Sequence, residues 1–333
     1  MPYEGVSAGP SRRYFIGSAL SIACEALSAG PAAAKLASYD PVNPDMLFGT
    51  VSSIWGNDYD YALKSAHRLG FQGMEPFRKN VMSYVDTPAH FRQLKEKTTA
   101  AGLVLIDVAN GGEGMASNFV DPAKTPETIA EHVAFARDML GPAGCDVWKI
   151  TMGGRPANNM MAENDLKVLA DTLNAIGKET IKYGVRLAPH PHVWGPLERE
   201  HEIRRMFELT DPSYVWWTAD TGHLLVGGMD PVQMVSDYFS RLAQVHLKDA
   251  PAKYRGNKVT PTRADNDKET VFRNLGKGVI DFPGLFKVLR DKHFKGWVTM
   301  DLDPDDPKAD DTYMTALAYL RSAVHLKWPA PRG

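Results

Sequence analysis

Short apolar runs alternate with longer amphipathic stretches along most of this 333-residue chain, and this alternation is what most restricts its fold. The runs are rich in β-branched and aromatic residues, as buried strands are. They occupy residues 47–52, 71–77, 104–109, 146–151, 185–190, 214–219, 243–248 and 297–302. The stretches between them repeat apolar residues three and four positions apart, which predicts helices. Strands that alternate with helices form parallel sheets.

The number of strand–helix units favours a closed barrel over an open sheet. Eight units within residues 45–328 match a (β/α)₈ TIM barrel, and we expect one catalytic domain there. An open doubly wound sheet is the main alternative, but FGTVSSIWGND after the first strand lacks the G-x-G-x-x-G spacing of a dinucleotide site. The polar connection 249–278 is long enough for a partial lid, and a solvated surface loop fits it almost as well.

Paired arginines near the N-terminus predict export. Arg12 and Arg13 precede a moderately apolar stretch and a small-residue segment near Ala34, which resembles a twin-arginine signal. We therefore expect residues 1–34 to engage the twin-arginine machinery and to deliver a folded protein to the periplasm. Beyond this signal the chain keeps one cysteine, Cys145, so an internal disulfide cannot form. A disordered basic tail is the alternative, and the cleavage site and lipidation of Cys24 stay open.

Charge and hydropathy narrow the class of partner. The formal net charge is −2 and no block of Lys and Arg is present, so a nucleic-acid partner is disfavoured. No apolar run approaches the roughly 20 residues of a membrane span. A small molecule is therefore the expected partner, and the oligomeric state stays open, with a homo-oligomer as one possibility.

Four predicted strands end on a histidine or an aspartate: His190, Asp220, His246 and Asp301. The carboxyl ends of barrel strands meet at one face, so we expect these four side chains to bind one metal ion. Mixed nitrogen and oxygen ligands suit Mn²⁺, Co²⁺, Fe²⁺ or Zn²⁺ better than Mg²⁺, and Mn²⁺ is our first expectation. Taken singly, each residue fits a structural role equally well.

Further polar and aromatic residues lie near predicted strand ends or in the long connection. We expect some of them to contact the substrate, although a tryptophan in such a place often belongs to the core. The candidate substrate-binding residues are Glu75, Asp107, Lys149, Trp194 and Arg273.

Four motifs in order resemble a known family. They are DTGH (220–223), HLKD (246–249), LGKGVIDFPGL (275–285) and GWVTMDLDP (296–304). They resemble the xylose-isomerase-like TIM barrels, the sugar phosphate isomerase/epimerase superfamily that includes inosose dehydratases and ketose 3-epimerases. The resemblance extends over residues 45–328. It implies that Asp220 and His246 are metal ligands, and that His223 and Lys248 lie in the substrate pocket.

The chain departs from the epimerase pattern at two places. Where the epimerases have a catalytic glutamate at the end of the fifth and of the last strand, this chain has His190 and Asp301. This departure puts a proton shuttle between two carboxylates in doubt. The His-x-His of His190 and His192 is more similar to the inosose dehydratases.

These residues predict proton abstraction next to the carbonyl of a non-phosphorylated keto-sugar, keto-glycoside or keto-cyclitol, through an enediolate. His192 or His223 would handle the proton, and Lys248 would neutralise the oxyanion or protonate a leaving group. We expect an isomerase or epimerase first. The alternatives are a lyase or dehydratase that eliminates a β-substituent from a 3-keto-glycoside or inosose, and a sugar-binding barrel without turnover. An apurinic-site nuclease is opposed by the net charge and the export signal.

Overall fold

A computed structural model describes residues 36–111, 115–156, 158–303 and 308–331. The chain divides into two compact units, Met1–Leu36 and Ala37–Gly333, and the second unit holds all the described helices and strands. The predicted export signal lies outside the described residues and stays a prediction. None of the described helices combines the length and the apolar character needed to cross a membrane.

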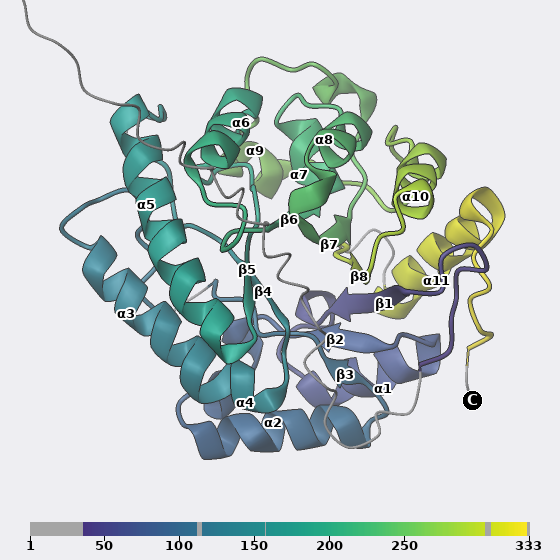
Figure 1. Ribbon diagram of the computed structural model, residues 1–333. Coiled ribbons are helices and arrows are strands. Elements are labelled where there is room, and N and C mark those ends of the chain that lie inside the picture. The colour runs from purple at the N-terminus through teal and green to yellow at the C-terminus, as the bar shows by residue number, and fades with distance from the viewer. Residues whose placement is uncertain (1–35, 112–114, 157, 304–307, 332–333) are drawn as a thin grey trace, which may run out of the picture. The chain divides into compact units, whose positions relative to one another are not determined.

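Eight parallel strands form the centre of the second unit, and helices surround them (Figure 1). Every predicted strand is present. The strands are β1 (Met46–Val51), β2 (Gly73–Glu75), β3 (Val104–Leu105), β4 (Val147–Ile150), β5 (Arg186–Pro189), β6 (Trp217–Asp220), β7 (Leu242–Leu247) and β8 (Gly296–Met300). Most of their side chains are buried, because in such a barrel one face meets the interior and the other meets the helices.

The strand pairing closes on itself. Six strands pair in the order β3-β2-β1-β8-β7-β6, and β4 pairs with β5. The first strand pairs with the last, with Phe48 opposite Val298, as the closure of a barrel requires. An isolated bridge between Leu187 and Val215 joins β5 to β6. Between β3 and β4 a side chain replaces the ladder, as the Lys149 N–H donates to Asp107 Oδ2 at 2.6 Å. The predicted (β/α)₈ barrel is confirmed.

The longer helices cover the barrel with one apolar face each. In α10, for example, Phe282, Leu285, Phe286 and Leu289 are buried at three- and four-residue spacing. The helices are α1 (Tyr59–Leu69), α2 (Pro88–Ala100), α3 (Thr125–Phe135), α4 (Gly141–Ala143), α5 (Glu163–Thr180), α6 (Glu200–Leu209), α7 (Thr221–Val226), α8 (Pro231–Asp237), α9 (Arg263–Lys268), α10 (Phe282–Asp291) and α11 (Ala309–Tyr319).

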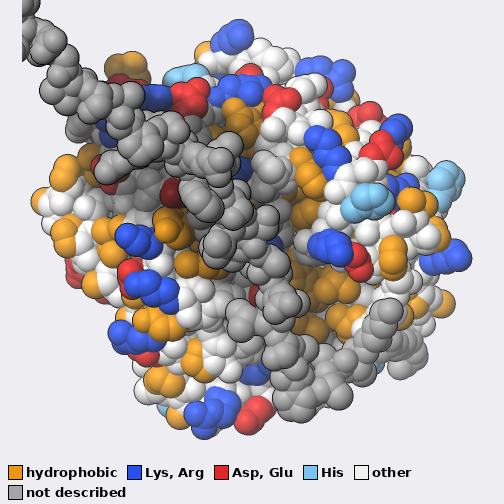
Figure 2. Space-filling view, viewed as in Figure 1, with side chains coloured by type: hydrophobic (Ala, Val, Ile, Leu, Met, Phe, Trp, Pro, Cys, Tyr) orange, Lys and Arg blue, Asp and Glu red, His pale blue; other side chains and the backbone are white. Residues whose placement is uncertain are grey.

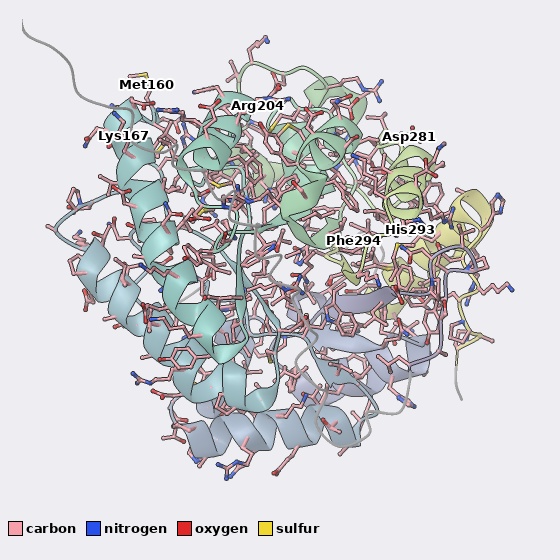
Figure 3. All side chains as sticks on the ribbon, viewed as in Figure 1. Met160, Lys167, Arg204, Asp281, His293 and Phe294 are labelled. Carbon is pink, nitrogen blue, oxygen red and sulfur yellow. The ribbon has the colours of Figure 1, made fainter. Side chains whose placement is uncertain are left out.

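Charged side chains occupy the outer surface of these helices. Figure 2 shows both signs of charge interspersed among uncharged side chains on the face that it draws, so this face has no field of a single sign. Arg204 on α6 is one of the outer residues (Figure 3), and it reaches Asp237 at the end of α8 at 3.0 Å. Such exposed pairs stabilise a fold by about 0–1 kcal/mol, so the buried faces hold the helices in place.

The long connection 249–278 is more ordered than a plain loop. It contains α9 and a 3₁₀ turn at Ala252–Tyr254. The carboxylate of Asp249 accepts backbone N–H groups from Gly276 and Gly278 at 3.0 Å each and from Ile280 at 3.2 Å. One aspartate therefore ties the two ends of the connection together directly after β7.

Candidate functional site

Three of the four predicted metal ligands form one buried cluster. His190 follows β5, Asp220 ends β6 and His246 lies in β7, and their ligand atoms all lie within 4.8 Å of one another. Asp220 is directly opposite His246 in the strand register. Asp220 Oδ2 lies 3.4 Å from His190 Nε2 and 4.0 Å from His246 Nδ1. Neighbouring parallel strands thus deliver two imidazoles and a carboxylate to one point.

The fourth predicted ligand, Asp301, follows β8 beside this cluster. Its Oδ2 lies 3.3 Å from His246 Nδ1, and its Oδ1 lies 3.3 Å from Lys248 Nζ. Burial alone would raise the pKa of Asp301, but Lys248 and His246 outweigh it and hold that pKa well below the usual range. Asp301 is therefore an ionised neighbour of the three-residue cluster, engaged by an ammonium group.

The chemistry of the cluster fits a divalent cation. Asp220 is fully buried, and burial raises the pKa of its carboxyl although Lys248 partly offsets that effect. His190 is also buried, its Nδ1 has no hydrogen-bond partner in the part of the chain that the structure describes, and burial lowers its pKa well below 6.5. A neutral imidazole is the form that binds metal, and a buried carboxylate is stabilised by a cation. Two nitrogen donors and one oxygen donor suit transition metals.

Glu75, at the end of β2, holds His246 in place. Its Oε2 lies 3.0 Å from His246 Nε2, and its Oε1 lies 3.0 Å from Lys149 Nζ. Burial opposes ionisation, but Lys149 and His246 lower the pKa of Glu75 to about 2. The ionised carboxylate fixes the imidazole with Nδ1 toward Asp220, as the outer partners of metal-binding histidines do. The structure thus places Glu75 and Lys149 against a predicted metal ligand, and their substrate contact stays a prediction.

Asp107, another predicted substrate contact, lies in the seam between β3 and β4. It is fully buried, and burial followed by the charge of Glu75 raises its pKa well above the usual range. Its Oδ2 accepts the Lys149 N–H, which gives it a structural role that residue spacing could not reveal.

His192 and His223, the two predicted proton carriers, lie against each other. Their ring centroids are 3.6 Å apart, and each ring lies 5.5 Å from the ring of His190. Nδ1 of His192 donates to the carbonyl oxygen of Val193, so in the neutral ring the lone pair is on Nε2. Burial lowers the pKa of His192 to about 3 and that of His223 well below 6.5. Both imidazoles are therefore neutral at neutral pH.

The DTGH motif places His223 through a strand-to-helix turn. Asp220 ends β6 and caps α7, because its Oδ1 accepts the His223 N–H at 2.9 Å. The glycine between them leaves room for a neighbour, since a Cβ on Gly222 would lie 2.6 Å from Lys248 Cγ. The motif therefore packs the second histidine and the lysine around one turn.

Lys248 is a buried, permanently charged group. Its Nζ lies 3.3 Å from Asp301 Oδ1 and 3.2 Å from Asp303 Oδ2. Burial works against the charge, but the two aspartates raise the pKa of Lys248 above its usual value. Phe272 of the long connection covers the ammonium at 4.7 Å and contacts the ring of His223 at 4.7 Å. Phe272 is not among the predicted site residues, because a single phenylalanine in a polar loop carries no signal of a site.

Two predicted substrate contacts are engaged by the long connection itself. Trp194 lies next to His192, yet its Nε1 donates to the Pro261 carbonyl at 2.6 Å and Arg263 covers its ring at 5.1 Å. The guanidinium of Arg273 donates to the carbonyls of Thr270 and Phe272 at 2.6 and 2.7 Å, and so it bonds within its own loop. Of these two residues, the structure brings only Trp194 to the histidine group.

Comparison with known proteins agrees with this architecture. The family model described as xylose isomerase-like TIM barrel matches residues 63–323. An inosose dehydratase from Clostridium beijerinckii is 27% identical over 280 residues, which cover 80% of this chain and 89% of that protein. The solved 3-keto-D-glucoside 4-epimerase from E. coli superposes with a TM-score of 0.64 at 18% identity, over 83% of this chain and 99% of that chain. A D-psicose 3-epimerase from Clostridium cellulolyticum superposes with a TM-score of 0.64 at 15% identity, over 84% and 99%. The chain belongs to the xylose isomerase-like TIM barrel family.

Proposed function

We propose that the protein is a metal-dependent enzyme that removes a proton next to the carbonyl of a non-phosphorylated keto-sugar, keto-glycoside or keto-cyclitol and then expels a β-substituent. One observation carries the proposal: His192 is neutral, with its lone pair on Nε2, beside the His190–Asp220–His246 cluster. The inosose dehydratases among the relatives support it, since the name describes loss of water from a keto-cyclitol.

A divalent cation would be held by His190, Asp220 and His246, with Asp301 beside them as the predicted fourth ligand. When bound, it would polarise the substrate carbonyl as a Lewis acid and so acidify the neighbouring C–H. Mn²⁺ is our first choice, and Co²⁺, Fe²⁺ and Zn²⁺ share the same ligand chemistry.

His192 and Lys248 carry out the proton transfers and the charge stabilisation. His192 Nε2 takes the proton, so the C–H bond breaks and its electron pair moves toward the carbonyl oxygen. The ammonium of Lys248, kept charged by Asp301 and Asp303, stabilises the negative charge that develops there. The pair then forms a C=C bond while the β C–O bond breaks. His192 then returns the proton to the leaving oxygen, so water or an alcohol departs.

Isomerisation or epimerisation is the second candidate, and it shares the first step. Asp301 favours it, because this ionised carboxylate lies beside the cluster without belonging to the three-residue ligand group. In that case Asp301 would exchange the proton, and no substituent would be lost. The epimerases among the structural neighbours support this option only through their fold.

Metal analysis and isotope exchange together test the proposal. We expect about one metal per chain in the purified protein and a loss to below about 0.2 in His246→Ala. In D₂O, 3-keto-glucosides or inosose would give an unsaturated product, whereas deuterium incorporation without elimination would identify the isomerase. His192→Ala is expected to lower kcat by about 10²–10⁴. The matched control His201→Ala, on the exposed face of α6, keeps full activity. A metal-free protein without exchange into any of these compounds would indicate a sugar-binding barrel.

We also propose that the protein is exported to the periplasm through the twin-arginine route. The pair Arg12-Arg13 and the following apolar stretch support this proposal. Replacing both arginines by lysine is expected to keep the protein in the cytoplasmic fraction. Equal periplasmic amounts of the two forms would contradict it.

A further inference from the structure

A pocket of about 390 Å³ opens beside His192 and lies mostly over strand ends that the metal cluster does not use. The cluster and Lys248 come from β5, β6 and β7, whereas the pocket is lined by residues that follow β2, β3, β4 and β5 and by one residue of α9. The lining includes Phe77, Lys79, Gly111, Thr151, His192 and Arg263. The pocket and the group of packed histidines, His190, His192 and His223, have His192 in common. The pocket therefore opens directly beside the histidines at the metal cluster.

The outer wall of this pocket is fixed by contacts between the long connection and the segment that follows β5. Arg263 lies on the ring of Trp194, whose Nε1 bonds to Pro261. The backbone N–H of Trp194 donates to Glu198 Oε2 at 2.7 Å, and Glu198 Oε1 accepts the Thr260 hydroxyl at 2.5 Å. Glu198 is 3% exposed, so this link is itself buried. The connection is thereby held against the segment that carries His192.

The lining suits a ring with both polar and apolar faces. Thr151, Lys79 and Arg263 offer hydrogen-bond donors, and Phe77 offers an apolar side. Its volume lies in the range of about 300–1,000 Å³ that small-molecule sites occupy. The described lining shares no residue with the His190–Asp220–His246 cluster, so the pocket offers space for a second ring beside the ring that reacts.

We propose that the pocket is the subsite for the aglycone of a keto-glycoside, the ring attached through the glycosidic oxygen to the ring that reacts. The inference rests on the proposed function and selects one of its three substrate classes. It places the glycosidic oxygen beside His192, the group that returns the proton to a leaving oxygen. The substrate is therefore a two-ring compound, and the departing group is an alcohol.

Steady-state kinetics on the metal-loaded enzyme test this assignment. The substrates are 3-keto-glucosides with methyl, phenyl and glucosyl aglycones, together with inosose. We expect kcat/KM to be about tenfold or more higher for a ring aglycone than for methyl, because even one methylene in a formed pocket changes it by about 10–200-fold. The phenyl and glucosyl arms decide whether the aglycone is aromatic or a sugar.

Two glycine variants give a matched pair. Among the described residues, a Cβ on Gly111 would meet only Thr151 Oγ1, at 3.4 Å, so Gly111→Leu is expected to fill the pocket without a clash with their backbone. A Cβ on Gly154 would meet no described atom within 4 Å, and Gly154 is exposed outside the pocket lining. Gly111→Leu is expected to remove the preference for a ring aglycone, and Gly154→Leu to keep it. Equal kcat/KM for methyl and ring aglycones in the wild type would overturn the proposal, as would an equal loss for all substrates in Gly111→Leu.

Binding of unreactive glucosides separates this proposal from the proposed function. Phenyl and methyl glucoside lack the carbonyl, so calorimetry measures the subsite without chemistry. If no keto compound reacts, the proposed function fails. The subsite proposal can still be tested in that case, because it requires that phenyl glucoside bind more tightly than methyl glucoside and that Gly111→Leu abolish this difference. Equal affinities for the two glucosides would refute the subsite even in an active enzyme.

Discussion

The buried histidine of α3, His132, should make the stability of the barrel depend on pH in a defined window. His132 is fully buried, its Nδ1 donates to the Thr128 carbonyl at 2.8 Å, and its Nε2 accepts from Asn110 Nδ2 at 2.8 Å. Asn110 cannot turn its amide to receive a second proton, because its Oδ1 accepts the Thr151 N–H at 2.7 Å. The site therefore accommodates only the neutral ring.

Burial, with a smaller contribution from Arg78, lowers the pKa of His132 from 6.5 to about 4. Below pH 6.5 His132 binds a proton in the unfolded chain, whereas in the folded chain it stays neutral until the pH approaches 4. Stability from this residue is complete above pH 6.5 and is lost as the pH falls toward 4. Since one pKa unit is worth about 1.4 kcal/mol, the free energy of unfolding should fall by about 2 kcal/mol from this residue between pH 7 and pH 5, and by about 3 kcal/mol in full.

Urea unfolding at pH 7, 6 and 5, followed by tryptophan fluorescence, measures this effect in wild type and His132→Gln. Other histidines near the active site titrate in both proteins, so the difference between the two pH slopes isolates His132. The variant should be less stable at pH 7 and should lose about 2 kcal/mol less than the wild type on acidification to pH 5. His201→Gln on the exposed face of α6 controls for the loss of a histidine and should keep the wild-type slope. Equal slopes in wild type and His132→Gln would refute the reasoning.

Three further predictions concern single contacts. Glu75→Gln removes the charge that fixes His246 and should weaken metal binding about 10–100-fold, as measured by competition with a chelator. An unchanged metal affinity would contradict the positioning role of Glu75. Trp194→Phe removes the hydrogen bond to the Pro261 carbonyl, which is worth about 0.5–1.5 kcal/mol, and should speed tryptic cleavage within residues 249–278. Equal cleavage rates in wild type and variant would show that this hydrogen bond does not hold the connection in place. Arg155→Met leaves Glu202 buried without its 2.6 Å partner and should cost about 3–5 kcal/mol in urea unfolding. The partly exposed control Arg204→Met should stay within about 0.5 kcal/mol, and similar losses for both variants would refute the assignment.

The sequence by itself determined the barrel and the centre of the site. The alternation of apolar runs and amphipathic stretches requires parallel strands covered by helices, and parallel strands bring their carboxyl ends to one face. His190, Asp220 and His246 meet for this reason, whatever the detailed packing. Their convergence is a consequence of topology, which periodicity encodes.

Only the tertiary structure decided which partner each polar group finds. Glu75 and His246 are hydrogen-bonded although they are 171 positions apart in the chain. Asp301 forms an ion pair with Lys248 and also lies beside the metal cluster. The same holds for Phe272, which covers Lys248 from a loop that the sequence shows only as polar. These contacts depend on ångström distances between elements remote in the chain. Hydrophobic periodicity sets the face on which a residue lies, but packing sets its neighbours, and the division between ligand, base and positioning residue follows from those neighbours.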